Sequence, residues 1–169
     1  MMETERLRLR RFRREDLQDL YEYLSDGEPL RFEPYLPMDI HGVGRELAER
    51  MESDEMIAVE LKSSGKLIGN LYLGKREFAS REIGYVFNRS YWGRGYARES
   101  CNALIQKCFS EGIHRIYAEC DPGNPASWRL LESLGFAREA HFRENVYFWK
   151  DETGNPIWKD TFVYSLLNP

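Results

Sequence analysis

Residues 90–97 read Ser-Tyr-Trp-Gly-Arg-Gly-Tyr-Ala and separate a short apolar segment from the most regular helical pattern of the chain. Gly93 and Gly95 allow the backbone to turn tightly and to approach a ligand closely. Free N–H groups at a helix start, together with the helix dipole, attract negative charge. Formal positive charge comes from three arginines in or near this stretch: Arg89, Arg94 and Arg98. The stretch therefore predicts either a site for a phosphate or pyrophosphate, or a plain tight turn.

The stretch is not one of the two commonest phosphate-binding motifs, because G-x-x-x-x-G-K-[ST] and G-x-G-x-x-G are both absent. After it, apolar residues recur with helical period and predict a helix from Tyr96 to Phe109, which Gly112 ends. A strand is predicted before the stretch, from Glu82 to Phe87, and another after the helix, from Ile113 to Cys120. Strand, helix and strand in this order predict a crossover between two parallel strands.

The rest of the chain predicts an α/β fold with antiparallel strands on either side of this crossover. The other predicted strands are Arg6–Arg10, Met56–Lys62, Lys66–Leu73 and a long hairpin of Phe136–Trp149 and Ile157–Leu167. The other predicted helices are Glu15–Leu24, about Gly44–Met51 and one that begins at Pro125 with Asn124 as N-cap. Because the first strand alternates strictly between arginine and leucine, we expect its arginines to lie on the solvent face.

The composition is that of one domain, residues 1–169. Apolar residues make up 42% of the chain and the formal net charge is -4, which lacks the basic excess of a general nucleic-acid binder. No apolar run reaches the ~18 residues of a membrane span, and the first 14 residues lack the apolar stretch of a secretory signal. Three cysteines without C-x-x-C spacing and three scattered histidines predict no disulfide framework and no metal site. We therefore expect a cytoplasmic protein that binds neither nucleic acid nor membrane.

Four short motifs, in this order and at these separations, resemble the GNAT superfamily of acyl-CoA-dependent N-acetyltransferases. They are Glu82-Ile83-Gly84-Tyr85, Tyr91-Trp92-Gly93-Arg94-Gly95-Tyr96-Ala97, Asn124-Pro125-Ala126-Ser127 and Leu134-Gly135-Phe136. The opening Thr4–Arg10, the following Glu15-Asp16-Leu17 and the tryptophan at position 92 are similar to the RimJ/RimL-like branch. The resemblance covers essentially the whole chain.

This resemblance implies the GNAT fold, a mixed and mostly antiparallel sheet with a splayed central parallel strand pair and flanking helices. It implies that acetyl-CoA is the co-substrate, with its pyrophosphate on the loop and its pantetheine arm in the splay. The implied cofactor-binding residues are Tyr85, Val86, Phe87, Arg89, Trp92, Gly93, Arg94, Gly95, Tyr96, Ala97, Asn124 and Ser127. Asn124 also suits a simple N-cap, and Ser127 is a common residue in a first helical turn.

The implied reaction is direct transfer of an acetyl group to a primary amine. It needs a base for the amine, a hydrogen-bond donor for the thioester oxygen and a proton for the leaving thiolate. A strand N–H near Val86 or Phe87 suits the second role, and Ser127 suits the third, because Leu131 stands where many members carry a tyrosine. Glu82 is the first candidate for the base, followed by Glu144, with Glu33, His141 and ordered water as further candidates.

The acceptor pocket is predicted between the loop Leu30–Met38 and the C-terminal hairpin. The expected substrate-binding residues are Phe32, Glu33, Tyr35, Phe142 and Tyr147, with Trp149 as a further wall residue. The carboxylates of Glu33 and Glu144 suit a cationic amine. A protein N-terminus, a polyamine, an aminoglycoside and an amino-acid-like amine remain open as acceptors, and a non-catalytic CoA-binding module remains open as an alternative function. The hairpin aromatics are equally compatible with a homodimer interface.

Overall fold

The computed structural model describes residues 2–169, in which eight strands form one sheet of order β1-β2-β3-β4-β5-β6-β8-β7. Only β5 and β6 are parallel neighbours within these residues. The strands are β1 (Met2–Glu3), β2 (Leu7–Arg10), β3 (Met56–Leu61), β4 (Lys66–Arg76), β5 (Ser80–Phe87), β6 (Arg115–Cys120), β7 (Ala137–Val146) and β8 (Lys159–Leu167). The helices are α1 (Leu17–Leu24), α2 (Ile40–Glu52), α3 (Tyr96–Ser110) and α4 (Pro125–Ser133), with short 3-10 helices η1 (Arg14–Asp16) and η2 (Arg89–Tyr91). The predicted mixed, mostly antiparallel sheet with one parallel pair is confirmed.

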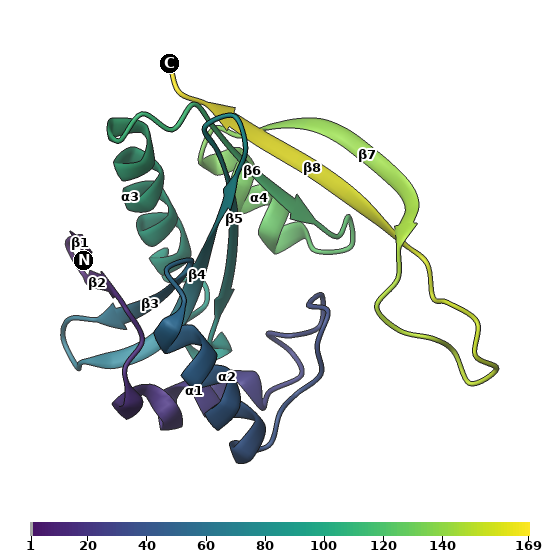
Figure 1. Ribbon diagram of the computed structural model, residues 1–169, viewed down its shortest axis with the longest axis horizontal. Helices are drawn as coiled ribbons and strands as arrows, with labels where there is room; N and C mark the ends of the chain where they lie inside the picture. The colour runs from purple at the N-terminus through teal and green to yellow at the C-terminus, as the bar shows by residue number, and fades with distance from the viewer. Residues whose placement is uncertain (1) are drawn as a thin grey trace.

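The parallel pair is short and opens along its length (Figure 1). Only Ser80–Glu82 of β5 pair with β6, opposite Arg115–Tyr117. Beyond them, β5 stays paired with β4 as far as Phe87, and β6 stays paired with β8 as far as Cys120. The facing edges of β5 and β6 therefore carry backbone groups that no strand of the described chain pairs, which is a place for an extended ligand to bind.

Helices cover both faces of the sheet and create two apolar cores. One core lies beneath α3 and α4 and includes Ile105, Leu131 and Ile116. The other lies beneath α1 and α2 and includes Leu20 and Val43. Neighbouring residues of the inner strands alternate between the two cores, as expected for strands buried on both faces.

Several element ends differ from the sequence prediction for local reasons. Helix α2 begins at Ile40 instead of Gly44, because the Asp39 side chain accepts a hydrogen bond from the Gly42 N–H at 2.7 Å and caps the helix earlier. Strand β6 begins at Arg115 instead of Ile113, because the Ile113 N–H bonds to the Cys108 carbonyl at the end of α3.

The hairpins also differ in length from the prediction. Strand β4 continues past Leu73 to Arg76, so that the β4–β5 hairpin is longer than its apolar pattern indicates. Strand β7 ends at Val146 and not at Trp149, after an irregularity in which Glu144 has a φ of +46°. Its partner β8 begins at Lys159, two residues after the predicted start.

The prediction that the first strand's arginines face solvent is wrong for Arg10. Its side chain is buried and donates to both oxygens of Asp16, at 2.8 and 2.7 Å, and to Glu60 at 2.7 Å. The alternation of arginine and leucine in β2 correctly places Leu7 and Leu9 in the core. It does not reveal that η1 covers part of the opposite face of the strand, where Arg10 lies.

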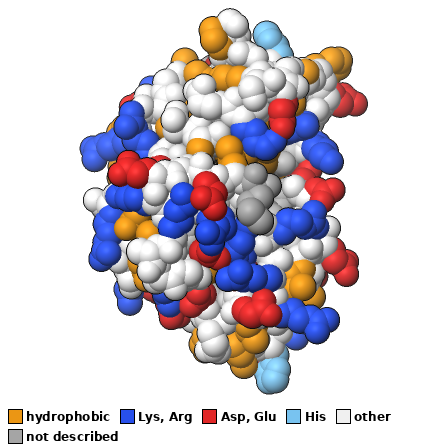
Figure 2. Space-filling view, turned by 90° about the vertical axis from the view of Figure 1, so that its left-hand side faces the viewer, with side chains coloured by type: hydrophobic (Ala, Val, Ile, Leu, Met, Phe, Trp, Pro, Cys, Tyr) orange, Lys and Arg blue, Asp and Glu red, His pale blue; other side chains and the backbone are white. Residues whose placement is uncertain are grey.

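The molecular surface around the N-terminus carries both charge signs. Figure 2 shows Lys and Arg side chains next to Asp and Glu side chains over this face. Within residues 2–169, no helix has the length and apolar character that a membrane crossing requires.

Candidate active site

The loop from Gly93 to Ala97 joins η2 to α3 and has the geometry of an anion site. Gly93 and Gly95 have φ values of +72° and +80°, which L side chains adopt only at a cost. Gly95 is the N-cap of α3. Within residues 2–169, the backbone N–H groups from Gly93 to Ala97 donate to no protein acceptor. They are therefore free to bind an anion at the positive end of the α3 dipole.

The side chains around this loop have different partners. The Trp92 indole N–H donates to the Phe87 carbonyl at 2.8 Å and ties the loop to the end of β5. Arg89 forms an ion pair with Asp26 at 2.7 Å, at the end of α1. Arg94 has no acidic partner within the described residues. Arg94 is thus the loop arginine best able to meet an incoming anion.

Tyr85 and Ser127 face each other across the opening between β5 and β6. The Tyr85 hydroxyl lies 2.9 Å from the Ser127 hydroxyl and donates to the Ser127 carbonyl at 3.1 Å. Burial raises the pKa of Tyr85 far above its ordinary value, so the phenol keeps its proton at neutral pH. The opening therefore contains two neutral hydroxyl groups in contact.

Asn124 has the predicted role of N-cap and also borders the opening. Its side-chain oxygen accepts a hydrogen bond from the Ser127 N–H at 3.2 Å. Its side-chain NH₂ donates to no other described residue. One end of this amide therefore fixes the first turn of α4, while the other end is free to donate to a ligand.

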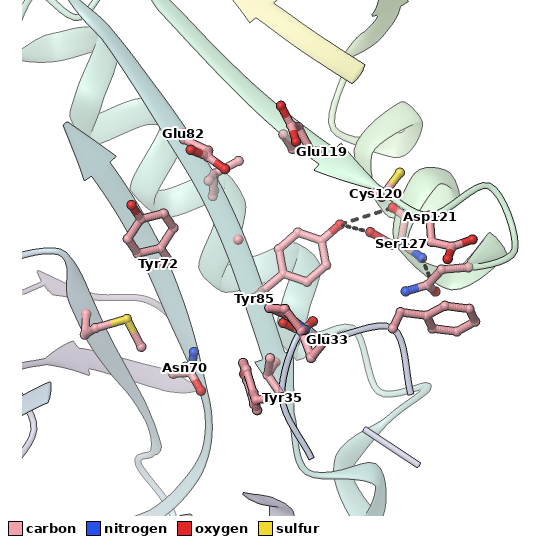
Figure 3. Close-up of a pocket in the computed structure, with 18 of the residues that line it drawn as sticks. Glu33, Tyr35, Asn70, Tyr72, Glu82, Tyr85, Glu119, Cys120, Asp121 and Ser127 are labelled. Atoms are coloured by element: carbon pink, nitrogen blue, oxygen red, sulfur yellow. Dashed lines mark hydrogen bonds between the residues drawn. The ribbon is translucent and has the colours of Figure 1, made fainter. Parts of the chain in front are cut away.

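A cavity of about 430 Å³ runs along this opening. Both strand edges line it, together with the loop after α1 (Figure 3). Glu46 and Arg50 of α2 complete the lining on one side. Five acidic residues and one basic residue are among its lining: Glu33, Glu46, Glu82, Glu119, Asp121 and Arg50. The cavity therefore favours a cationic guest.

Three of the five acids already have a cationic partner. Glu46 pairs with the buried Arg50 at 2.7 Å, and Asp121 pairs with Lys159 at 2.5 Å. Glu82 pairs with Arg76 and also accepts from the Tyr117 hydroxyl at 3.3 Å. Within the described residues, the remaining two, Glu33 and Glu119, form no ion pair.

The environment of Glu33 raises the pKa of its carboxyl group to about 7. Burial is the main cause, and the charge of Arg50 and the nearby Tyr35 hydroxyl only partly oppose it. Burial also raises the pKa of Glu119, with the Glu82 charge acting in the same direction and Arg76 against it. A carboxyl group that titrates near neutral pH inside a cavity is suited to accept a proton.

The family model described as "Acetyltransferase (GNAT) domain" matches residues 6–137. The chain belongs to the GNAT acetyltransferase family. The Bacillus subtilis (strain 168) protein named uncharacterized N-acetyltransferase YnaD is 32% identical over 173 residues, which span 97% of this chain and 95% of that protein. This GNAT chain is thus an N-acetyltransferase.

Solved GNAT structures have the same fold. The acetyltransferase (GNAT family) from Bacillus anthracis is 30% identical, with a TM-score of 0.89 over 99% of this chain and 98% of that chain. The spermidine N-acetyltransferase from Vibrio cholerae, solved in complex with CoA and spermine, is 21% identical, with a TM-score of 0.79 over 98% of this chain and 97% of that chain. At 21% identity, the similarity to the Vibrio cholerae structure shows only that the two proteins share a fold.

Many of the residues predicted for a GNAT site lie together at the cavity. Phe32, Glu33 and Tyr35 line it from the loop after α1. Glu82, Tyr85 and Val86 line it from β5, and Asn124 and Ser127 line it from the start of α4.

Other predicted residues lie outside the cavity lining, on the C-terminal hairpin. Phe142 and Tyr147 are 49% and 43% exposed, and the Tyr147 ring packs edge-on against Trp158. Glu144 is exposed, and its backbone N–H donates to the carboxylate of Asp160. Their roles as base or substrate contacts remain predictions.

The sequence prediction did not include several residues that line the GNAT cavity. They are Glu46, Arg50, Asn70, Tyr72, Glu119, Cys120 and Asp121. Asn70 could have been found from the sequence, because a polar residue within the apolar strand β4 is a signal for a functional position. The sequence contains no signal for the burial of Arg50, because a charged residue on an amphipathic helix is expected to face solvent. Among the described residues, no group of three or more His, Cys, Asp or Glu is arranged to hold a metal ion.

Proposed function

We propose that this GNAT enzyme transfers an acetyl group from acetyl-CoA to the primary amine of a cationic acceptor that enters the cavity between β5 and β6. One observation carries the proposal: a single cavity includes both strand edges and two carboxyl groups, and within residues 2–169 the edges are unpaired and the carboxyl groups have no cationic partner. The strand edges suit the extended arm of the co-substrate, and the carboxyl groups suit an ammonium group.

The residues present fit acetyl-CoA. The N–H groups of the loop from Gly93 to Ala97 and the side chain of Arg94 suit the pyrophosphate, since they have no partner in the part of the chain that the structure describes. The edge of β5 from Tyr85 to Phe87 and the free NH₂ of Asn124 suit the amides of the pantetheine arm. The neighbour from Vibrio cholerae was solved with CoA, which supports the same use of the fold here.

We assign the proton-transfer roles to two groups that line the cavity, Glu33 and Ser127. Glu33 removes a proton from the acceptor ammonium, because its carboxyl group lines the cavity, has no cationic partner among the described residues and has a pKa of about 7. Ser127 supplies a hydrogen bond or a proton to the departing sulfur. Glu82, the first candidate from the sequence, is a weaker candidate for the base, because Arg76 stabilises its charged form and competes for its oxygens.

The acceptor is a cationic amine, and two classes of it fit. The sequence motifs of the RimJ/RimL-like branch support a protein N-terminus. The acidic cavity supports a small polyamine equally well, and the Vibrio cholerae neighbour was solved with spermine. Both acceptors present an ammonium group to Glu33.

An acetylation screen tests this function. Purified protein is incubated with acetyl-CoA and either peptides of varied N-terminal residue, polyamines, aminoglycosides or amino acids, and CoA release is measured. We expect activity with at least one cationic amine and none with versions of the same compounds in which every primary amine is acetylated. Calorimetry that detects no binding of acetyl-CoA to the folded protein would contradict the proposal.

A further inference from the structure

The side chain of Arg6, just before β2, reaches the loop from Gly93 to Ala97. Its Nη1 donates to the Arg94 carbonyl at 3.0 Å, and its Nε donates to Glu99 Oε2 at 2.7 Å. Its Nη2 lies 2.7 Å from the same Glu99 oxygen, and its guanidinium carbon lies 4.5 Å from the centre of the Tyr96 ring. One side chain thus contacts the loop and the first turn of α3 together.

Glu99 is itself held firmly by the N-terminal segment. Its Oε1 accepts hydrogen bonds from the Arg6 backbone N–H at 2.9 Å and from the Thr4 hydroxyl at 2.5 Å. Burial acts to raise the pKa of Glu99, but the hydrogen bonds from Thr4 and Arg6 outweigh it and keep the pKa below its ordinary range. The Arg6–Glu99 pair is therefore ionised on both sides at neutral pH and fixes the guanidinium.

The contact with the Arg94 carbonyl determines the orientation of one peptide group. In a trans peptide the C=O of one residue and the N–H of the next point in opposite directions, and residues 2–169 contain no cis peptide bond. A carbonyl held toward Arg6 therefore turns the Gly95 N–H away from Arg6. This N–H is among the loop donors that have no acceptor within residues 2–169.

We propose that Arg6 is a positioning residue for co-substrate binding: it holds the Arg94–Gly95 peptide so that the Gly95 N–H faces the pyrophosphate. This inference rests on the proposed binding of acetyl-CoA by the loop. Arg6 also offsets the charge of Glu99, which otherwise stands one turn from the anion. Lysine at position 6 keeps that charge, but a single ammonium group lacks the planar fork that reaches Glu99 and the carbonyl together.

The test compares the affinity for CoA of wild type, Arg6→Lys and Arg6→Ala by calorimetry. We expect the Kd for CoA to rise by about tenfold or more in both variants, as for the loss of a hydrogen bond that involves a charged group. The Kd for pantetheine, which lacks the pyrophosphate, is measured by NMR titration and should change by less than about twofold. Arg11→Lys is the matched control, since Arg11 makes an exposed ion pair with Asp54.

Two further comparisons separate positioning from charge and from general stability. If only charge matters, Arg6→Lys binds CoA like wild type, which overturns the inference, and Arg6→Ala/Glu99→Gln recovers affinity. Positioning requires that the double variant remain weak. If a variant loses the same affinity for CoA and for pantetheine, the defect is structural and the inference is overturned. If Arg6→Ala does not fold, the measurements on Arg6→Lys alone decide between the outcomes. Wild-type protein that does not bind CoA at all contradicts the proposed function instead.

Discussion

The hydroxyl oxygens of Tyr85 and Ser127 lie 2.9 Å apart, and the two side chains come from opposite sides of the opening between β5 and β6 (Figure 3). The phenol has one proton, which can go to the Ser127 carbonyl or to the Ser127 hydroxyl oxygen. When it goes to the hydroxyl oxygen, the serine proton is free to point at another acceptor. This pair can therefore direct a hydrogen bond at a sulfur atom that develops negative charge in the opening.

Replacement of Ser127 tests this arrangement. We expect Ser127→Ala to lower the single-turnover rate by about 100-fold, in the range of general acid catalysis, with little change in the Kd for acetyl-CoA. Ser133→Ala is the control on the same helix, because its hydroxyl only bonds the Leu130 carbonyl. An unchanged single-turnover rate in Ser127→Ala would remove the serine from the chemistry.

The pH dependence of catalysis tests Glu33. A base acts in its deprotonated form, so kcat/KM of the wild type should rise with pH through about 7 and level above it. Glu33→Gln should lose this rise and be about 100-fold slower at the plateau. The groups that face Glu33 are Arg50 on α2 and Tyr35 on its own loop, and neither titrates in this range.

Glu82→Gln and Glu144→Gln are the comparison variants for this profile. We expect both to keep the rise near pH 7. If Glu82→Gln abolishes it while Glu33→Gln keeps it, the base is Glu82. A stability measurement gives a second readout: because the folded state raises the Glu33 pKa, this group opposes folding as pH rises. Glu33→Gln should therefore gain stability relative to wild type at pH 8 compared with pH 5.

Gly95→Ala tests the loop backbone. A φ of +80° costs an alanine about 1–2 kcal/mol, and a Cβ at this position would lie 3.4 Å from the Arg6 guanidinium. We expect lower thermal stability and a Kd for CoA raised about tenfold or more. Gly44→Ala in α2 is the matched control, because a Cβ at this position meets no atom within 4 Å. The higher helix propensity of alanine should make this variant about 0.5–1 kcal/mol more stable than the wild type. CoA affinity that is equal in the two variants would contradict the role of the loop.

Glu60→Gln tests the buried ionic cluster. Glu60 accepts from Arg8, Arg10 and Arg13 at 2.5, 2.7 and 3.0 Å, and its loss leaves Arg10 partly uncompensated. We expect the free energy of unfolding to fall by about 3 kcal/mol at pH 7. Burial acts to raise the Glu60 pKa, but the arginines outweigh it and hold the pKa below 4.5. The stabilisation is thus present above pH 4.5 and is lost as pH falls through the folded value.

Chemical denaturation from pH 3 to pH 7 measures this effect. The difference between wild type and Glu60→Gln should shrink at the acid end. Glu52→Gln, at the exposed end of α2, should stay within about 0.5 kcal/mol of wild type throughout. A constant difference between wild type and Glu60→Gln over the whole pH range would contradict this assignment.

Local sequence signals predicted the fold because glycines, caps and apolar periods act over a few residues. Gly93 and Gly95 have the left-handed conformation that a tight loop before a helix requires, and Asn124 caps α4 as its position indicated. Such features do not depend on distant partners. The family resemblance then supplied the arrangement of strands that local signals leave open.

Long-range pairing explains what the sequence could not predict about the site. Glu82 was the first candidate for the base, but Arg76, which lies beyond the predicted end of its strand, pairs with it once β4 extends. Glu33 and Arg50 lie far apart in sequence and share the cavity only after α1 and α2 pack on the sheet. The charge state of a carboxyl group depends on such neighbours, so it requires the tertiary structure.

The two apolar cores also differ in when the chain can complete them during synthesis. Every buried residue of the core beneath α1 and α2 lies between Phe12 and Val86, whereas the core beneath α3 and α4 requires residues as late as Tyr164. Because N-terminal portions emerge from the ribosome first, the earlier core can form while the later one is still being translated. The cavity wall made by residues 32–86 would then serve as the template onto which β6 and α4 close.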